Sequence, residues 1–328
     1  MAEDSGWTRD RMPDQTGRTV VVTGANSGLG YEVTEAFAAK GATVVLACRS
    51  ASRGQNAAAD VRQSVTDPSL DVRELDLADL SSVESFAVGL TADYDAVDVL
   101  CNNAGVMAVP YQLTADGFEQ QFGVNHLGHF ALTGHLLELL RAGDGRSRVV
   151  TQSSGLHERG ELDFDRVSGG EAPDPVAERA YDKWDAYARS KLANLLFAFE
   201  LDRRLDAAGV DDVVSLASHP GYANTNLQRR GPEQAGSRLR LWAMTLANLL
   251  FAQDAAMGAL PMLYAAAADG LEGGEYVGPD GAMNMRGHPT LDTPSPAARD
   301  RATAERLWAL SEELTGVTYD LAPAAPAE

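Results

Sequence analysis

The sequence predicts an α/β fold in which a doubly wound parallel sheet carries helices on both faces. Short β-branched segments alternate with longer segments of helical periodicity from residue 18 onward. The strand-like segments are 19–22, 43–46, 70–75, 97–100, 148–151, 213–216 and 275–277, and the helical ones include 29–39, 79–90, 114–141, 187–208 and 297–314. Alternation of this kind favours parallel strands joined by crossover helices. We therefore expect a seven-stranded parallel sheet in the order 3-2-1-4-5-6-7.

A single domain is expected to span residues 18–315. Residues 1–17 precede the first strand as an N-terminal extension, and residues 316–328 end in APAAPAE, which is typical of a flexible tail. Two segments interrupt the alternation of strands and helices. Residues 155–180 are polar and rich in Gly and Pro, which predicts an inserted surface loop, and residues 222–253 are apolar after a Pro-Gly turn, which predicts a helical lid over a substrate.

Acidic residues dominate the composition. Asp and Glu outnumber Lys and Arg by 47 to 27, and the formal net charge is -20. Such a charge repels phosphodiester backbones, so we expect no nucleic-acid partner. Only three of the basic residues are lysines. An acidic, lysine-poor surface is typical of a protein in a salt-rich cytoplasm, where screening makes the charge tolerable; an ordinary acidic protein is the alternative.

Several features predict a cytoplasmic protein without a transmembrane segment. The first ten residues, MAEDSGWTRD, lack the basic and apolar regions of a secretory signal. The longest apolar stretch, 241–252, is shorter than the roughly 20 residues that a spanning helix needs. Cys48 and Cys101 both end apolar strand segments, which indicates buried free thiols. The Leu-, Trp- and Met-rich residues 239–251 fit a lid or pocket wall for an apolar substrate, or plain core, better than a membrane contact.

A glycine-rich turn, TGANSGLG at 23–30, follows the first strand and precedes the first helix. Glycines there let the backbone approach a pyrophosphate, and the helix N-terminus offers N–H groups to the anion. Glycines also occur in βα turns for packing reasons alone, but this position is the one that a dinucleotide motif requires. No Gly-Lys-Ser/Thr follows at P-loop spacing. The sequence therefore predicts a dinucleotide site of the Rossmann type.

The second strand ends in ACRS at 47–50. In NAD sites an acidic residue here binds the ribose 2′-hydroxyl, whereas this chain has Arg49, with Arg53 one helical turn further on. A guanidinium suits a 2′-phosphate through its charge and fork geometry. We therefore expect NADP(H), with NAD(H) and an ordinary solvated arginine as the alternatives. Asp76, at the end of the third strand, either contacts the adenine or caps a helix.

Tyr187 and Lys191 lie four residues apart in a helical segment, so they share one face of the helix. A free tyrosine titrates near pH ~10, and a neighbouring ammonium together with an oxidised nicotinamide favours the phenolate and lowers that pKa. The Tyr-x-x-x-Lys spacing also arises by chance. The pair Ser153-Ser154 supports a catalytic interpretation because it follows the fifth strand, where open α/β sheets bind ligands.

These motifs together resemble the short-chain dehydrogenase/reductase family, and most closely its retinol dehydrogenase-type members. The matching segments are TGANSGLG (23–30), ACRS (47–50), DLADL (76–80), NNAGVM (102–107), VNHLGHF (124–130), SSGLH (153–157), YARSKLANLLF (187–197) and HPG (219–221). The resemblance implies an NADP(H)-dependent oxidoreductase that moves a hydride between the nicotinamide and an apolar aldehyde, ketone or alcohol.

The resemblance also implies a role for each matching residue. Tyr187 would be the general acid/base, Lys191 would bind the nicotinamide ribose and lower the tyrosine pKa, Ser154 would orient the substrate oxygen, and Asn125 would hold a water in a proton relay. The residues implied in cofactor binding lie in the glycine turn, at the strand ends, on the catalytic helix and at the Pro-Gly turn: Thr23, Gly24, Asn26, Ser27, Gly28, Leu29, Gly30, Arg49, Arg53, Asp76, Leu77, Asn103, Ala104, Gly105, Tyr187, Lys191, Pro220, Gly221 and Thr225.

The family resemblance further implies a homodimer or homotetramer built on the long helical segments 114–141 and 187–208. A non-catalytic NAD(P)-sensing protein on the same fold is the alternative function. Such proteins usually lack part of the catalytic set, which is complete here. Sugar epimerisation would need a nucleotide-sugar pocket, for which the sequence has no signal.

Histidines do not predict a metal site. His126, His129 and His135 recur at helical spacings, but no cluster of Cys, Asp or Glu joins them, so we expect helix packing and no bound metal. His219 precedes the Pro-Gly turn and is expected to shape it.

Overall fold

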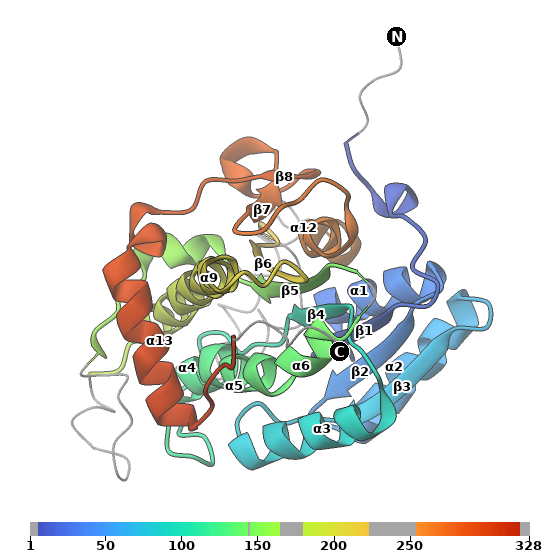
Figure 1. Cartoon of the computed structure of the whole chain (residues 1–328). Coiled ribbons are helices and arrows are strands. Elements are labelled where there is room, and N and C mark those ends of the chain that lie inside the picture. Colours follow the sequence, from blue (N-terminus) through green and yellow to red (C-terminus); the bar gives the residue numbers. More distant parts are fainter. Residues whose placement is uncertain (1–5, 144, 165–179, 223–253, 322–328) are drawn as a thin grey trace.

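The structure, a computed structural model, describes residues 6–143, 145–164, 180–222 and 254–321. An eight-stranded sheet with the order β3-β2-β1-β4-β5-β6-β7-β8 lies at its centre (Figure 1). The strands are β1 (Thr19–Thr23), β2 (Thr43–Cys48), β3 (Ser69–Glu74), β4 (Val99–Asn102), β5 (Ser147–Gln152), β6 (Val213–Ser218), β7 (Tyr276–Pro279) and β8 (Pro289–Leu291). The seven strands that the sequence predicts are parallel and stand in the predicted order, which confirms the doubly wound α/β fold.

The eighth strand is the part of the sheet that the sequence analysis missed. β8 has three residues and pairs antiparallel with the end of β7. A strand this short carries too little periodicity to be detected. It begins with Pro289, which lacks an N–H group and is tolerated because β8 lies at the edge of the sheet. The strand matters for the site, because Asp292 follows it directly.

Helices cover both faces of the sheet (Figure 1). One face packs against α1 (Gly28–Ala39), α2 (Ala51–Ser64) and α12 (Ala255–Ala267), and the other packs against α3 (Leu80–Asp93), α5 (Gly128–His135), α6 (Leu137–Arg141) and α9 (Lys183–Ala208). Side chains alternate between the two apolar layers along each strand: Val20 and Val22 of β1 join the first layer, and Val21 joins the second. Because both faces are buried, the strands are apolar throughout.

The single helix expected at 114–141 is wrong, because the segment is divided. It contains α4 (Gln120–Phe122), a π-helix at Gly123–Leu127, and then α5 and α6. Helical structure begins only after Glu119, whose carboxylate accepts the N–H groups of the first helical residues. A Cβ atom at Gly128 would lie 2.5 Å from the carbonyl oxygen of Leu77, so this glycine at the start of α5 allows a close approach to the loop after β3.

The last described helix, α13 (Arg301–Thr315), packs against α9 and is followed by an ordered segment. We expected a flexible tail from residue 316. Instead Val317, Tyr319 and Leu321 pack against the apolar layer that contains α5, and the Tyr319 hydroxyl donates a hydrogen bond of 2.6 Å to the carbonyl of Phe130. The alternation of apolar and polar residues at 317–321 explains this packing. Residues 322–328 lie outside the described part of the chain.

The other expected segments are placed in part. The N-terminal extension packs on the domain, with Met12 buried and the Trp7 ring 5.3 Å from that of Tyr264. The expected insertion begins with a 3₁₀ helix at Gly155–Arg159, and its residues 165–179 are outside the described residues. The lid expected at 222–253 is also outside them, apart from its first residue. No helix in the described ranges has the length and apolarity needed to cross a membrane.

Candidate active site

A cavity of about 600 Å³ lies at the carboxyl ends of the parallel strands, where open α/β sheets bind their ligands. Its volume falls in the range that small-molecule and cofactor sites occupy. Every residue that the sequence analysis assigned to cofactor binding lines this cavity, except Thr225, which lies outside the described residues. Of the four catalytic candidates, Ser154, Tyr187 and Lys191 line it as well, and Asn125 lies behind its wall.

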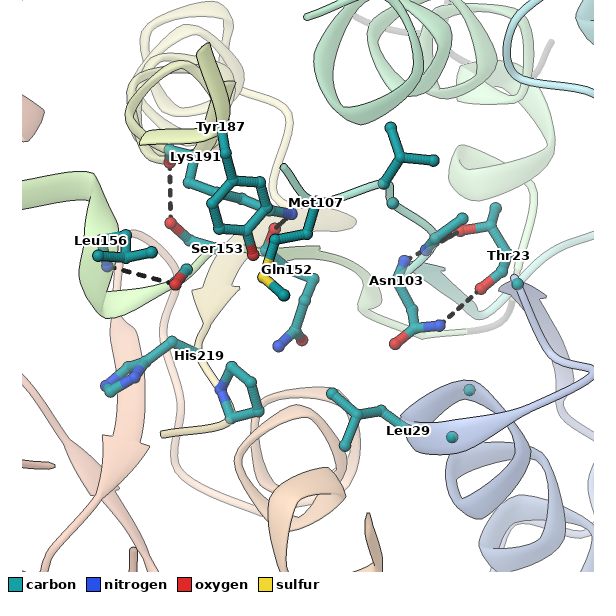
Figure 2. Close-up of a pocket in the computed structure, with 18 of the residues that line it drawn as sticks. Thr23, Leu29, Asn103, Met107, Gln152, Ser153, Leu156, Tyr187, Lys191 and His219 are labelled. Atoms are coloured by element: carbon teal, nitrogen blue, oxygen red, sulfur yellow. Dashed lines mark hydrogen bonds between the residues drawn. The ribbon is translucent and has the colours of Figure 1, made fainter. Parts of the chain in front are cut away.

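The glycine turn is fixed to the neighbouring strand by Thr23. The Thr23 hydroxyl accepts hydrogen bonds from the backbone N–H groups of Asn103 and Ala104, both at 2.9 Å, and the Asn103 amide donates to the Thr23 carbonyl (Figure 2). Gly24 has φ +67°, a conformation that favours glycine. A Cβ atom at Gly30 would lie 2.4 Å from the carbonyl oxygen of Gly24, so the first turn of α1 approaches the loop as closely as a pyrophosphate site requires.

The rim next to β2 carries the two arginines and Asp76. Arg49 and Arg53 are exposed and line the cavity, with Arg53 in the first turn of α2. Asp76 lines it from the loop after β3. The helix-capping alternative for Asp76 is wrong, because Asp79 caps α3 by accepting the N–H groups of its first turn. The rim therefore offers two guanidinium groups and one carboxylate beside the glycine turn.

Tyr187 and Lys191 extend from α9 into the cavity, opposite Leu29 of the glycine turn (Figure 2). Both are almost fully buried, with 5% and 3% of their surface exposed. The Lys191 Nζ atom donates to the carbonyl oxygen of Gln152 at 2.9 Å and lies 5.8 Å from the centre of the Tyr187 ring. The structure thus places the phenol and the amine on one helical face, beside each other.

The protein's own groups do not lower the Tyr187 pKa as the sequence analysis expected. Burial raises the pKa of Tyr187 to about 12, opposed by a hydrogen bond with Ser154. Burial also lowers the pKa of Lys191 to about 7, because the ammonium loses its hydration. An amine that is only partly charged near neutrality attracts a phenolate weakly. A lowered tyrosine pKa therefore depends on further positive charge next to the phenol.

The two serines after β5 have different roles in the structure. The Ser153 hydroxyl donates to the Lys191 carbonyl at 2.8 Å and so ties β5 to α9. The Ser154 hydroxyl accepts the Leu156 N–H at 3.2 Å, hydrogen bonds with Tyr187 and lines the cavity. Both serines therefore line the cavity, and it is the Ser154 hydroxyl that hydrogen bonds with the phenol.

Asn125 is fully buried, and all three of its side-chain bonds go to protein groups. Its amide oxygen accepts the Val106 N–H at 2.8 Å, and its amide nitrogen donates to the Val106 carbonyl at 3.0 Å and to the Ser190 hydroxyl at 2.9 Å. The Ser190 hydroxyl in turn donates to the Tyr187 carbonyl. Asn125 thereby joins the loop after β4 to the catalytic helix.

The sequence analysis did not identify the part of the cavity wall that the C-terminal part of the chain contributes. His219 lies 2.9 Å from the carboxylate of Asp292, and its other ring nitrogen accepts the Gly221 N–H at 3.3 Å. Asn284 donates to the second oxygen of Asp292 at 2.7 Å. His219 therefore shapes the Pro-Gly turn as predicted. Its partner lies 73 residues away in the sequence, so no local motif could identify Asp292.

No group of three or more His, Cys, Asp or Glu side chains in the described ranges could hold a metal ion. His126 and His129 are buried within the helical layer, and burial lowers their pKa values to about 3 and about 4. Both cysteines are buried free thiols, as predicted, and burial raises their pKa values. The cavity brings the phenol of Tyr187 and the amine of Lys191 together with the glycine turn.

Comparison with known proteins shows the family of the chain. Residues 18–162 match the family model described as short chain dehydrogenase. The chain belongs to the short-chain dehydrogenase family. It is 40% identical over 306 residues to retinol dehydrogenase 12 of Homo sapiens, covering 93% of this chain and 88% of that protein. It is 39% identical over 303 residues to retinol dehydrogenase 13 of Homo sapiens, covering 92% and 85%.

A solved structure of an uncharacterized protein from Mycobacterium paratuberculosis shares 42% sequence identity and a TM-score of 0.76 with this chain, covering 96% of it and 100% of that protein. The resemblance to retinol dehydrogenase-type members is thereby confirmed. The protein is an oxidoreductase that acts on alcohol or carbonyl groups.

Proposed function

We propose that the protein transfers a hydride between NADP(H) and an apolar aldehyde, ketone or alcohol, with Tyr187 as the general acid/base. One observation carries this proposal: the glycine turn, the buried Tyr187–Lys191 pair and the Ser154 hydroxyl all border the same cavity. A dinucleotide bound along the glycine turn would extend toward the phenol, which is where the chemistry has to occur.

The residues of the cavity fit NADP(H). The glycine turn and the N-terminus of α1 would hold the pyrophosphate, because Ser27 makes no side-chain cap there and leaves the first N–H groups to an anion. Arg49 and Arg53 would hold the 2′-phosphate through charge-assisted hydrogen bonds. Lys191 would hold the nicotinamide ribose. When bound, the cofactor supplies or accepts the hydride.

The chain's own residues manage the proton. In the reduction of a carbonyl, Ser154 holds the substrate oxygen and Tyr187 donates its phenolic proton to that oxygen as the carbon receives the hydride. After this proton transfer the product is an alcohol, and Tyr187 is a phenolate. Lys191, whose pKa of about 7 lets it lose a proton near neutrality, restores the phenol, directly or through water. Oxidation of an alcohol follows the same steps in reverse.

Apolar side chains at the other end of the cavity support an apolar substrate. Met107, Leu156, Trp184, Met283 and Met285 line the cavity. Thioether and aromatic groups adapt to bulky apolar ligands without offering charge. The names of the relatives, retinol dehydrogenases 12 and 13, point in the same direction.

A turnover screen tests this function. Purified protein is assayed against a panel of apolar aldehydes, ketones and alcohols, with NADP(H) and NAD(H), at low and high salt. We expect turnover with at least one bulky apolar substrate and faster turnover with the phosphorylated cofactor. Tight NADPH binding without turnover across the whole panel would contradict the enzymatic proposal and favour a cofactor-sensing protein.

A further inference from the structure

His129 lies behind the cavity, on the first turn of α5, and its ring connects two parts of the site. It is 1% exposed. Its Nδ1 atom lies 3.0 Å from the carbonyl oxygen of Asn125, and its Nε2 atom lies 3.0 Å from the hydroxyl of Thr23. One buried imidazole therefore spans the distance between the glycine turn and the π-helix that carries Asn125.

The hydrogen-bond partners of His129 fix its tautomer. A carbonyl oxygen only accepts, so the Nδ1 atom must carry the proton that it donates to Asn125. Burial lowers the pKa of His129 to about 4, which keeps the ring neutral, so the Nε2 atom is an acceptor. The ring then needs a donor at Nε2, and Thr23 provides a hydroxyl at that position.

The hydrogen bonds of Thr23 are complementary to this tautomer. The backbone N–H groups of Asn103 and Ala104 occupy both lone pairs of its hydroxyl oxygen. Its single proton faces two acceptors, the His129 Nε2 atom at 3.0 Å and the Cys101 carbonyl at 3.2 Å. The ring thus helps to set the orientation of the hydroxyl that anchors the loop after β4 to the glycine turn.

On its other side, His129 contacts an irregular part of the helix, the π-helix at Gly123–Leu127. A π-helix displaces the backbone hydrogen-bond ladder by one residue and often marks a functional position. The Nδ1–H group of His129 gives the Asn125 carbonyl a donor inside this turn. Asn125 in turn contacts Val106, and it reaches the Tyr187 carbonyl through Ser190.

We propose that His129 is a positioning residue that couples the dinucleotide-binding turn to Asn125, and thereby to the catalytic helix. This inference rests on the proposed function, since it assigns His129 to the same site. Its chemical requirement is a neutral side chain with one donor and one acceptor on opposite sides. A glutamine offers both groups, whereas a leucine fills a similar volume and offers neither.

His126 supplies a matched control. It lies one helical turn before His129, is also 1% exposed, and has a pKa that burial lowers to about 3. Its Nε2 atom contacts the Ser311 hydroxyl of α13 at 2.9 Å, on the side away from the cavity. His126→Leu therefore reports what the loss of a buried imidazole from this part of the helix does by itself.

The experiment compares His129→Leu, His129→Gln and His126→Leu in the full-length protein. For each, kcat, the KM and Kd for NADPH, and the amide hydrogen exchange of residues 103–106 without nucleotide are measured. We expect His129→Leu to lower kcat and weaken NADPH binding, each by roughly tenfold, because two buried hydrogen bonds are lost. The exchange of residues 103–106 should also become faster. His129→Gln should recover most of each effect, and His126→Leu should leave all of them within about twofold of the wild type.

Other results would overturn the coupling role. One is a His129→Leu protein that keeps wild-type kcat, NADPH affinity and exchange. Another is a His129→Gln protein that falls as far as His129→Leu, or a His126→Leu protein with the same losses, since either would show a general packing effect. If the wild type binds NADPH without turnover, the proposed function fails, yet affinity and exchange still decide the role of His129.

Discussion

The two ends of the cavity are built in different ways. At the cofactor end, the wall comes from the glycine turn and the loops after β2, β3 and β4, which lie within the first third of the chain and are held by close glycine packing and by hydrogen bonds of the Thr23 and Asn103 side chains to backbone groups. At the catalytic and substrate end, the wall comes from α9, the Pro-Gly turn and the segment around β8, which are held by side chains such as the His219–Asp292 pair.

Burial also differs between the ends. Arg49 and Arg53 are exposed at the cofactor end, where solvent screens them, whereas Tyr187 and Lys191 are buried and have shifted pKa values. On the proposed function, the cofactor end would supply affinity through a shaped backbone, and the catalytic end would supply chemistry through a few desolvated groups. Substitutions at the two ends should therefore separate binding from turnover.

The largest expected effect is at the phenol. Tyr187→Phe removes the proton donor but keeps the ring, so we expect kcat to fall by roughly 10³-fold, with NADPH affinity nearly unchanged. Steady-state kinetics and fluorescence titration measure the two quantities. Tyr94→Phe is the control, because that hydroxyl binds Asp71 outside the cavity. A Tyr187→Phe protein with kcat within tenfold of the wild type would contradict the proposal that the phenol at the catalytic end transfers the proton.

The next largest effect is expected at the buried amine of Lys191, where one substitution should lower activity and raise stability. Lys191→Met is expected to lower kcat by roughly 10²-fold, because the phenol loses its proton partner. The same change should raise the melting temperature at pH 6, because burial of a charged lysine destabilises the folded protein. Lys40→Met, outside the cavity, is the control.

The pH dependence of this stabilisation follows from the lowered pKa. The pKa of Lys191 is about 7 in the folded protein, against the usual lysine value of 10.5. Below pH 7 the Lys191 amine is charged in both the folded and the unfolded protein, so the cost of burying the charge destabilises the folded protein in full. As pH rises toward 10.5, the amine loses its proton first in the folded protein, so this cost decreases. Differential scanning calorimetry should show a larger gain for Lys191→Met at pH 6 than at pH 9. A gain that grows with pH would contradict the assigned burial effect.

At the cofactor end, the sharpest change is in nucleotide preference. Arg49→Ala removes a guanidinium from the position next to the expected 2′-phosphate, so we expect the ratio of NADPH to NADH affinity to fall by roughly tenfold or more, with kcat at saturating cofactor little changed. Isothermal titration of both nucleotides measures the ratio. Arg62→Ala, at the far end of α2, should not change it. An unchanged ratio for Arg49→Ala would make Arg49 an ordinary surface residue.

The same division explains what sequence could predict. The cofactor end consists of short, contiguous motifs whose glycines have a direct backbone purpose, such as Gly24 with its positive φ, and the residues assigned to it line the cavity, apart from Thr225, which lies outside the described residues. The proximity of Tyr187 and Lys191 was predicted because four residues are about one helical turn. The tyrosine pKa was not, since desolvation depends on the whole surrounding structure.

Sequence reasoning failed where contacts join distant segments. Asp292 reaches His219 only because β8 pairs with β7, and a strand of three residues leaves no periodic signal. The division of 114–141 includes a π-helix at Gly123–Leu127, which helical periodicity does not reveal. The order of residues 316–321 depends on an aromatic cluster that includes Phe130 and Trp308, contributed by separate helices.

The smallest expected effect lies at that ordered tail, which belongs to neither end of the cavity. Tyr319→Phe removes its hydrogen bond to the Phe130 carbonyl and keeps the packing of the ring, so we expect a loss of about 1 kcal/mol in unfolding free energy, or a few degrees in melting temperature, with kcat and nucleotide affinity unchanged.

Residues 316–321 and α13 pack on α5 and α9 of the same chain. They therefore cover part of the two helical segments on which we expected a homodimer or homotetramer to assemble. Light scattering of the wild type and of a protein ending at residue 315 tests whether that covering matters. We expect the truncated protein to associate more than the wild type, since it exposes Phe130 and Trp308. Equal masses for the two proteins, with the stability loss confined to the truncated one, would restrict the tail to a packing role and leave assembly to other surfaces.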